Sequence, residues 1–488
     1  MPVNLSNSNV ATRENRIGSI TGYVGTLKDL ATQSECGTLK GCSRCFSQSS
    51  TCLSMCGLGQ LAGIRDVAII HHGPAGCSVT GAGSYYMSKV MSKKRGVTSN
   101  TVYVGTDMNE NDTIFGSTET LRNIILEVNK RYQPKAIFVS SSCATGIIGE
   151  DIDSIVDEVR EEVGVPIVAV HCEGFKSRIW ATGFDISDHA VLQAIVQPPR
   201  EGVKTNKINF KNFYESARPE IIEMFQKFDL EPVFLYCNST VEELSHLSES
   251  IATTCICGTL GNYLGNVLEE KYGVPYVRSI NQCGITGFET WLREIGKVTG
   301  RSEKVEAYIE EQRAIYIPQI EEVKKELKGL TAVLGMGPGY TFEVSRVLDE
   351  LGIKVVWALA WHYDKKYENG DVPPSMKYLL DNDIDFEASV ADQQNYEVMN
   401  ILNKYQPDMY LSRHPGSTVW AIKNGTPAIY VADEYMIFGY KHTLEFAKTI
   451  LDAIRNRSFE ENLARRSKLP YTDWWYQQNV DAFLEEAK

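Results

Sequence analysis

The sequence predicts an α/β fold made of three doubly wound, Rossmann-like domains with parallel sheets. Short apolar runs rich in β-branched residues recur along the chain, and each is followed by a loop and a stretch with helical periodicity. This alternation is typical of parallel strands that are buried between helices. The chain has 488 residues, which gives room for roughly two to four domains with complete hydrophobic cores.

The predicted strands are short apolar runs bounded by turn-forming or polar residues. They are Val67–His71, Thr101–Val104, Ala136–Ser140, Pro166–Val170, Pro232–Tyr236, Pro275–Arg278, Thr331–Leu334, Ile353–Leu359, Met409–Ser412 and Pro427–Val431. The predicted helices begin at capping residues or prolines and have apolar residues on one face. They are Ser117–Tyr132, Glu150–Val163, Pro219–Phe228, Thr240–Ile251, Gly258–Tyr272, Glu303–Lys328, Thr341–Leu351 and Tyr440–Asn456.

Two polar stretches predict the domain boundaries. Gln197–Lys211 contains two prolines and mixed charge, and the long charged helix ends near Lys328 and Gly329. We therefore expect an N-terminal segment plus the first α/β domain over residues 1–210, a second over 211–329 and a third over 330–455. Residues 456–488 form a C-terminal tail, whose aromatic Tyr471–Tyr476 stretch we expect to pack against a neighbouring subunit.

Composition excludes several classes of function. The net charge is −13 and no basic run offsets it, which argues against a nucleic-acid partner. No stretch approaches the roughly 18 uninterrupted apolar residues of a membrane span, and the polar N-terminus has no signal-peptide core. We expect a cytoplasmic protein. In a reducing cytosol, 12 cysteines are poorly explained as disulfides, so they favour metal or redox chemistry.

The cysteines carry the strongest functional signal. Cys52, Cys77 and Cys143 each have glycine or hydroxyl neighbours in a predicted loop, and Cys257 begins a predicted helix. Thiolates are the preferred ligands of iron–sulfur clusters, and glycines let backbone N–H groups approach them. Several thiols follow predicted strands, and ligands of open parallel sheets bind at the carboxyl ends of strands. For Cys172, Cys237, Cys255 and Cys283 we favour a packing role.

These segments resemble the α-type subunit of nitrogenase component 1, over most of the chain. The motifs that carry the resemblance are His72-Gly-Pro-Ala-Gly-Cys77, Asn111-Asp-Thr-Ile-Phe-Gly116, Cys143-Ala-Thr-Gly-Ile-Ile-Gly-Glu-Asp151, His171-Cys-Glu-Gly-Phe-Lys176, Cys257 with Glu269-Glu-Lys-Tyr-Gly-Val-Pro275, and His362-Tyr-Asp-Lys-Lys-Tyr-Glu368. The last of these is more similar to catalytic α subunits than to the related scaffold proteins.

The resemblance implies two iron–sulfur groups. Cys52, Cys77 and Cys143 match the ligands of a P-type cluster that is shared with a β-type subunit, although Cys45 and Cys56 lie close to Cys52 in the sequence. Cys257 matches the ligand of a larger catalytic cofactor, and a thiolate at a helix start is physically favoured. We expect the turn containing Gly335 and Gly337, and also His362, beside that cofactor. A plain tight turn is the alternative for the glycines.

The departures from the family pattern concern the substrate pocket. Nitrogen-reducing members carry a glutamine and a histidine where this chain has Trp180 and Phe184, and the second cofactor-ligand histidine is replaced in the region of Asp433. Asp433, His442 or His414 are the candidates for that role. An apolar pocket suits a small thioether, so methylthio-alkane reductases fit best. These enzymes cleave C–S bonds of dimethyl sulfide or 2-methylthioethanol to methanethiol and a hydrocarbon.

The resemblance also implies partners. This chain has no phosphate-binding Gly-x4-Gly-Lys-Ser/Thr loop, so ATP hydrolysis belongs to a separate homodimeric Fe protein. We expect an α2β2 assembly with a β-type subunit. The candidate proton donors are His71, His171, Lys176, Arg178, Asp433 and His442.

Three alternative functions remain: a non-catalytic cofactor-assembly scaffold, a nitrogen-reducing α subunit and a tetrapyrrole-reducing relative. The sequence leaves open the heterometal, the organic ligand of the cofactor and the roles of Cys36, Cys42, Cys45 and Cys56.

Overall fold

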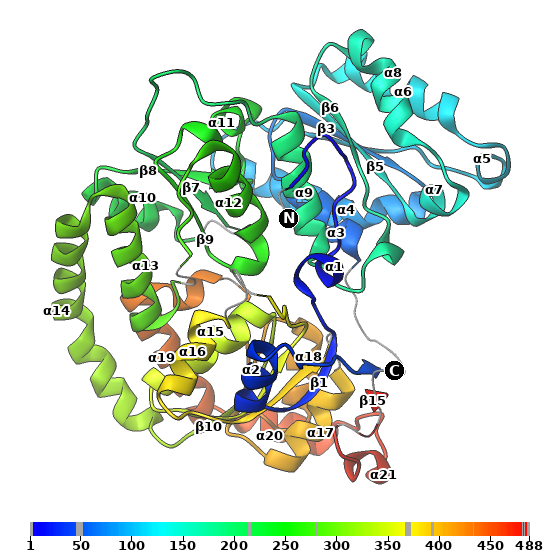
Figure 1. Cartoon of the computed structure of the whole chain (residues 1–488). Coiled ribbons are helices and arrows are strands. Elements are labelled where there is room, and N and C mark those ends of the chain that lie inside the picture. Colours follow the sequence, from blue (N-terminus) through cyan, green and yellow to red (C-terminus); the bar gives the residue numbers. More distant parts are fainter. Residues whose placement is uncertain are drawn as a thin grey trace. The chain divides into compact units, whose positions relative to one another are not determined.

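The structure is a computed structural model that describes residues 3–44, 52–212, 216–278, 282–366, 372–391, 395–432, 434–480, 482 and 484–485. The chain forms two compact units (Figure 1). The first comprises Met1–Arg16 and Thr51–Val277, and the second comprises Ile17–Ser50 and Arg278–Lys488. The first unit contains two parallel sheets and the second contains one large, mostly parallel sheet, which confirms the predicted α/β class.

The first sheet has the strand order β4-β3-β5-β6, and all its pairings are parallel. Its strands are β3 (Val67–His72), β4 (Val102–Gly105), β5 (Ala136–Ser141) and β6 (Ile167–Val170). Every residue of β3, β5 and β6 is buried, because helices cover both faces of the sheet. Alternate residues serve the two faces, so Ile70 and Val139 lie in a different apolar cluster from Ile69 and Phe138.

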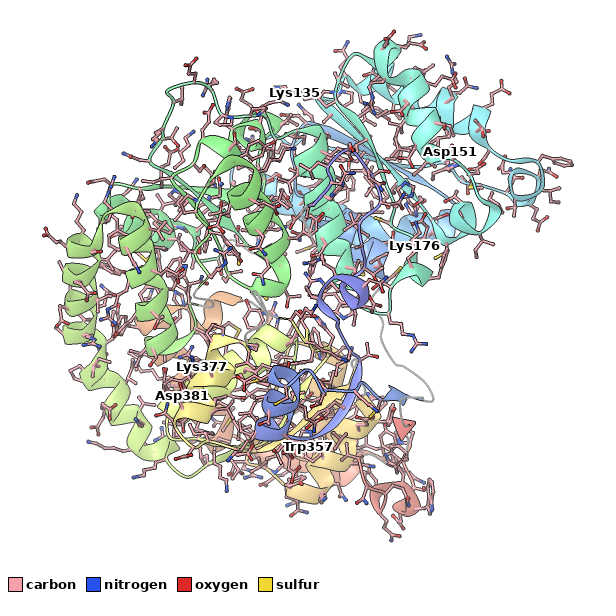
Figure 2. The ribbon with its side chains drawn as sticks, in the orientation of Figure 1. Lys135, Asp151, Lys176, Trp357, Lys377 and Asp381 are labelled. Atoms are coloured by element: carbon pink, nitrogen blue, oxygen red, sulfur yellow. The ribbon has the colours of Figure 1, made fainter. Side chains whose placement is uncertain are left out.

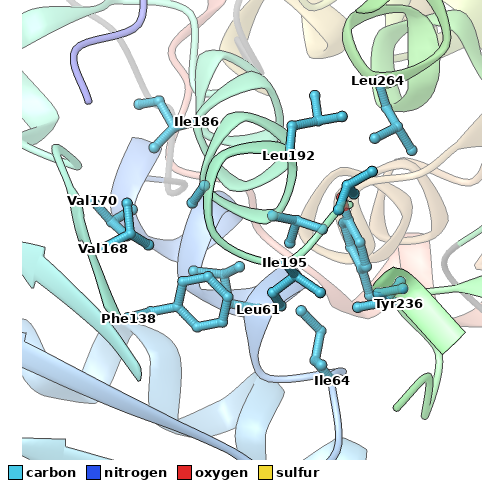
Figure 3. Packing of buried hydrophobic residues seen from close by; sticks show 14 of the residues in the cluster. Leu61, Ile64, Phe138, Val168, Val170, Ile186, Leu192, Ile195, Tyr236 and Leu264 are labelled. Carbon is cyan, nitrogen blue, oxygen red and sulfur yellow. The ribbon is translucent and has the colours of Figure 1, made fainter. Parts of the chain in front are cut away.

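Helices α6 (Thr118–Tyr132) and α8 (Ile152–Val163) cover one face and lie side by side in Figure 1. On the other face, Phe138 and Val168 pack with α3 (Leu53–Leu61) and α9 (Thr182–Ala194). Figure 3 shows Leu61, Leu192 and Ile195 in this cluster, with Tyr236 and Leu264 from the region of the second sheet. The two sheets of the first unit therefore share one hydrophobic core, and each large side chain buried there contributes roughly 1.5–3 kcal/mol.

The second sheet of this unit has the order β8-β7-β9, again with parallel pairing. Its elements are β7 (Lys207–Lys211), α10 (Arg218–Lys227), β8 (Glu231–Leu235), α11 (Val241–Ser245), β9 (Ala252–Cys255) and α12 (Gly258–Tyr272). Strand β7 crosses the predicted domain boundary at residue 210. The predicted strand Pro275–Arg278 is wrong, since this segment contributes only an isolated bridge between Tyr276 and Thr253. The predicted helix Thr240–Ile251 is shorter and continues as a 3-10 turn.

The sheet of the second unit has the order β1-β12-β11-β10-β13-β14. Its strands are β1 (Gly22–Thr26), β10 (Thr331–Met336), β11 (Lys354–Ala360), β12 (Glu387–Ala391), β13 (Met409–Ser412) and β14 (Ala428–Tyr430). Strand β1 comes from the N-terminal segment and pairs antiparallel with β12. The indole N–H of Trp357, labelled in Figure 2, donates to the Ser389 hydroxyl at 3.0 Å and ties β11 to β12.

The long helices of the second unit pack on one another. They are α13 (Gly284–Thr299), α14 (Ser302–Leu327) and α19 (Gly439–Arg455), and α15 (Pro338–Glu350) joins β10 to β11. The amphipathic pattern predicted α14 and α19 to within a residue or two at each end. In the described ranges, every helix is too short or too polar to cross a membrane.

Candidate metallocluster site

The three thiols of the predicted boundary cluster lie at the starts of three helices. Cys52 is the N-cap of α3, Cys77 lies in the first turn of α4 (Ala75–Lys94), and Cys143 is the first residue of α7 (Cys143–Ile148). The predicted loop location is therefore wrong for Cys77 and Cys143. Helix starts present unpaired N–H groups, which favour thiolates. Because β3 and β5 are adjacent, the helices that follow them begin at one edge of the sheet.

Gly174 lies beside two of these thiols, Cys52 and Cys143. A Cβ atom at Gly174 would lie 2.9 Å from the Cys52 sulfur and 3.4 Å from the Cys143 sulfur. The Gly174 N–H donates to the Cys143 sulfur at 3.2 Å. Burial raises the pKa of the Cys77 thiol, and the nearby Cys143 and Cys52 raise it further. The three sulfur atoms thus share one electrostatic environment.

This arrangement fits an iron–sulfur cluster. Burial and the neighbouring thiols oppose ionisation of Cys77, and coordinated iron would supply positive charge that favours its thiolate form. The absent side chain of Gly174 leaves room beside two sulfurs, and its N–H is a donor of the kind that tunes cluster potentials. Within the described ranges, no group of three His, Cys, Asp or Glu side chains is arranged to hold a single metal ion.

The neighbouring cysteines differ from these three. Cys172 is fully buried, and burial raises the pKa of its thiol well above the usual range, which fits the packing role expected for it. Its sulfur lies against Gly57 of α3, where a Cβ would approach within 3.2 Å. Cys56 follows Cys52 by one turn of α3, and Cys45 lies outside the described residues. Cys52 is the thiol of this stretch that lies beside Gly174.

His171 and Lys176 belong to a charged group next to Gly174. His171 Nε2 lies 2.7 Å from Asp153 Oδ2, and its Nδ1 lies 3.4 Å from Glu173 Oε1. Lys176, labelled in Figure 2, pairs with Glu173 at 2.8 Å. Burial lowers the pKa of His171, but the hydrogen bonds to both carboxylates outweigh it and raise the pKa to about 9. His171 is therefore a cation at neutral pH.

His71 and His72 are also buried near this edge of the sheet. His71 Nδ1 lies 2.7 Å from the Ser140 hydroxyl. Burial lowers the pKa of His71 to about 4, and the charge of the adjacent His72 contributes to the same shift. His72 contacts Glu150, whose other oxygen accepts from the Ser117 hydroxyl at 2.7 Å. His71 is therefore neutral at pH 7, and it donates no proton from a charged form there.

Trp180 and Phe184 contact each other edge to face. Their ring centroids are 5.7 Å apart with an angle of 88° between the planes. Phe184 lies in the first turn of α9 and is buried, whereas Trp180 precedes the helix and is half-buried. Such a pair favours apolar contacts over hydrogen bonding. The two rings therefore form one aromatic surface.

Cys257 is the N-cap of α12, at the helix start that the sequence predicted. Its side chain is buried. Sequence reasoning missed the residue that fixes this helix start. Arg13, in α1 (Arg13–Ile17), pairs with Asp185 of α9 at 3.1 and 2.7 Å, and it also donates to the backbone carbonyl of Thr259 in the first turn of α12. Arg13 lies in a polar N-terminal stretch with no sequence signal for burial.

The remaining candidates lie in the second unit. Gly335 lies within β10 beside the Tyr410 hydroxyl, and Gly337 is the N-cap of α15, directly after the strand ends at Met336. His362 is buried directly after β11. His442 of α19 lies 3.5 Å from Glu445, and His414 Nδ1 accepts from the Ser417 N–H at 3.1 Å. Asp433 lies outside the described residues, and Arg178 is exposed in the first unit.

Comparison with known proteins places these features in one family. A family model described as "Nitrogenase component 1 type Oxidoreductase" matches residues 52–455. The chain is 29% identical over 324 residues to a nitrogenase molybdenum-iron protein alpha chain of Methanosarcina barkeri, a match that covers 64% of this chain and 60% of that relative. It is 28% identical to the corresponding chain of Methanothermobacter marburgensis over 80% of this chain and 84% of that relative.

A second type of relative matches over a similar length. The nitrogenase iron-molybdenum cofactor biosynthesis protein NifE of Methanococcus maripaludis is 27% identical, and the match covers 80% of each chain. Among solved structures, "Nitrogenase Cp1 at pH 5" superposes with a TM-score of 0.68 at 21% identity and covers 89% of this chain and 94% of that one. This likeness supports the fold.

Proposed function

The chain belongs to the family of nitrogenase component 1 type oxidoreductases, and we propose that it is the catalytic α-type subunit of a nitrogenase-like reductase that cleaves C–S bonds. The proposed substrates are small methylthio-alkanes such as dimethyl sulfide and 2-methylthioethanol. For dimethyl sulfide, one C–S bond breaks, and two electrons and two protons convert the fragments to methane and methanethiol. For 2-methylthioethanol, two electrons and two protons would give ethylene, methanethiol and water. The observation that carries this proposal is the approach of the Cys52 and Cys143 sulfurs at Gly174, together with the electrostatic effect of both thiols on Cys77.

The proposed metal groups need different parts of the first unit. Cys52, Cys77 and Cys143 would hold a P-type cluster, and the Gly174 N–H would donate to one of its sulfur ligands. Cys257 would hold one end of a larger cofactor of unidentified heterometal, with the start of α12 stabilising its thiolate. Such groups store and transfer low-potential electrons.

The surface beside the thiols supports a partner subunit. Ile114 and Phe115 of α5 (Glu110–Phe115), Ile147 of α7 and Phe175 beside Gly174 are 71%, 83%, 75% and 57% exposed. Exposed apolar side chains in one region mark protein interfaces. We propose that a β-type subunit covers this patch and supplies the other ligands of the cluster. A homodimeric, ATP-hydrolysing Fe protein would supply the electrons to an α2β2 assembly.

The aromatic pair supports a thioether substrate. Trp180 and Phe184 replace a glutamine and a histidine of nitrogen-reducing members, and their rings contact each other edge to face. Thioether sulfur makes favourable contacts with aromatic rings, worth about 0.3–1.5 kcal/mol. Protons would come from the charged group of His171 and Lys176, which is already paired with carboxylates. An apolar surface also limits access of water and unproductive proton reduction.

A cofactor-assembly scaffold is the second candidate, because the NifE relative matches this chain over the same share of its length as an α chain does. The two functions differ in turnover. The chain, co-produced with a β-type subunit and purified without oxygen, would be assayed with an Fe protein, ATP and dithionite. We expect iron in excess of one boundary cluster, and methanethiol from dimethyl sulfide. Bound iron without methanethiol from any thioether would favour the scaffold, and ammonia from N2 would favour a true nitrogenase.

A further inference from the structure

The first unit contains a basic cavity that none of the cluster chemistry uses. Its volume is about 400 Å³, and its cationic lining comprises Arg65, Arg95, Lys207 and Arg218. Arg65 precedes β3, Arg95 ends α4, Lys207 begins β7 and Arg218 begins α10. The cavity therefore lies where elements of the first and second sheets meet within one unit.

The charge in this cavity opposes the charge of the whole chain. Four cations face two carboxylates, Glu231 and Glu243, in a protein whose net charge is −13. Both glutamates are exposed. The Glu243 carboxylate also accepts from the N–H and the hydroxyl of Thr240 at 2.7 and 3.0 Å, as part of the capping box of α11. The cavity therefore retains a local excess of positive charge, which attracts anions.

Two of the arginines are held in place by the turn that follows β8. Arg65 Nε donates to the Asn238 carbonyl at 2.9 Å, and an Arg95 terminal nitrogen donates to the Cys237 carbonyl at 3.3 Å. The terminal nitrogens of Arg65 have no partner among the described residues, and the side chain is half-buried. A positioned guanidinium with both terminal nitrogens available is suited to paired bonds with a phosphate or a carboxylate.

Arg218 is oriented by an aromatic ring. Its guanidinium carbon lies 4.1 Å from the centroid of the Phe234 ring, and Phe234 is itself buried in β8. Stacking on a ring fixes the plane of the guanidinium. Two planar cations on different elements are thus preorganised, which reduces the entropic cost of binding a ligand.

The cavity is distant from the thiols. Helix α4 begins near Cys77 and ends at Arg95, so the two ends are separated by about 27 Å at 1.5 Å per residue. A ligand in the cavity would contact neither Cys77 nor the aromatic pair. Its binding can therefore be measured independently of metal content and catalysis.

We propose that this cavity binds a small multivalent oxyanion, a molecule with at least two phosphate or carboxylate groups. Arg65 forms paired hydrogen bonds with its oxygens, and Arg95, Lys207 and Arg218 add positive charge. The volume of about 400 Å³ lies within the range of ordinary small-molecule sites and exceeds that of a single inorganic anion. This binding activity is separate from the proposed reductase reaction and does not depend on it.

Calorimetric titration of the anaerobically purified full chain tests the proposal. Inorganic pyrophosphate and citrate are the two titrants, and sodium chloride holds the ionic strength constant. We expect one saturable site per chain for at least one titrant. Arg65→Gln and Arg218→Gln should each weaken binding by about tenfold or more. The matched control, Lys130→Gln, removes one exposed positive charge of α6 in the same unit and should change the affinity by less than about twofold.

If only pyrophosphate binds, the ligand of this cavity carries phosphate groups, and if only citrate binds, the ligand carries carboxylates. Binding of both would support a site for oxyanions in general. Absence of saturable binding, or equal weakening by Lys130→Gln and Arg65→Gln, would overturn the proposal. Arg65→Lys keeps the positive charge but loses the planar guanidinium, so its affinity should lie between those of the wild type and Arg65→Gln. This variant keeps the test usable if the glutamine variants fold poorly. Thermal unfolding of each variant verifies its fold.

Discussion

The backbone N–H of Gly174 donates a hydrogen bond to the sulfur of Cys143, with 3.2 Å between the two atoms. The same glycine leaves open a position that a Cβ would fill, 2.9 Å from the Cys52 sulfur. One backbone position therefore both donates to the Cys143 sulfur and leaves room beside the Cys52 sulfur. The electrostatics and the shape of the candidate cluster site depend on a residue that carries no side chain.

Gly174→Ala is expected to lower the iron content of the boundary cluster. The added methyl group would approach the Cys52 sulfur within 2.9 Å, which is closer than ordinary contact, so the thiols or η1 (Gly174–Lys176) must move. Iron analysis and the electron paramagnetic resonance signal of anaerobic preparations would measure the loss. Gly83→Ala in α4 is the matched control, because its Cβ position has no described atom within 4 Å apart from its chain neighbours and the backbone of α4 itself. Equal iron in both variants would contradict the assignment of Gly174.

Cys257→Ala should lose the larger cofactor and keep the boundary cluster. Cys257 begins α12, whereas the other three thiols begin α3, α4 and α7, so the two ligand sets are on separate helices. The expected result is a partial loss of iron together with complete loss of thioether reduction. Cys36→Ala, at an exposed thiol, should change neither quantity. If Cys257→Ala removed the iron of both groups, or of neither, the separation of the ligand sets would be wrong.

The sequence predicted the strands that are apolar and missed those that bury polar groups. Strands β3 and β5 consist mainly of β-branched and aromatic residues and were predicted to within one residue. Strands β7 and β9 contain Asn209 and Thr253, whose side chains hydrogen-bond to each other at 3.1 Å inside the sheet. That partner exists only after the strands are paired, so an apolar pattern cannot reveal it.

The features of the candidate site also fall into those that the sequence predicted and those that it missed. The thiols and the aromatic pair were found from residue type and from resemblance, whereas helix α4 was missed because glycines and serines weaken its helical pattern. Arg13 was missed because its partner Asp185 lies 172 positions away. A charged residue in a polar segment is predicted to be solvated, and only the fold brings it to a buried carboxylate.

Arg13→Gln is expected to destabilise the first unit by about 3–5 kcal/mol, because it leaves the buried Asp185 carboxylate with one partner fewer. Side chains of both residues in the pair are at most 2% exposed. Urea unfolding of the wild type and the variant would measure the difference in unfolding free energy. Arg122→Gln removes an exposed pairing with Glu158 and Glu162, and about 1 kcal/mol or less is expected. Equal costs for the two variants would contradict the buried role of Arg13.

The stabilisation that His171 provides should disappear at alkaline pH. Its pKa is about 9 in the folded chain and about 6.5 when unfolded. Because the folded value is raised, the contribution is complete below about pH 6.5 and is lost as the pH rises through about 9. The difference in unfolding free energy between the wild type and His171→Gln should shrink across this interval. His246→Gln, at a histidine whose side chain is 30% exposed, serves as the control. A difference that does not vary with pH would contradict the charged state.

Phe184→His should reduce kcat/KM for dimethyl sulfide by about tenfold or more, because an imidazole replaces the apolar edge that contacts Trp180. Gas chromatography would measure the methanethiol produced. The yield of dihydrogen should rise, because polar groups and water enter the pocket. Phe459→His, at a phenylalanine of α20 (Ser458–Arg466) that is 65% exposed, should leave the rate unchanged. Unchanged thioether turnover in Phe184→His would remove the main support for an apolar substrate.

Strand β1 is synthesised more than 360 residues before its partner β12. At about 5–20 residues per second, this edge strand waits for tens of seconds with its N–H and C=O groups unpaired. The first unit is synthesised during this interval and can fold before the last sheet is closed. Biogenesis should therefore depend on chaperones that shield the nascent N-terminus, and truncation before residue 387 should leave β1 prone to aggregation.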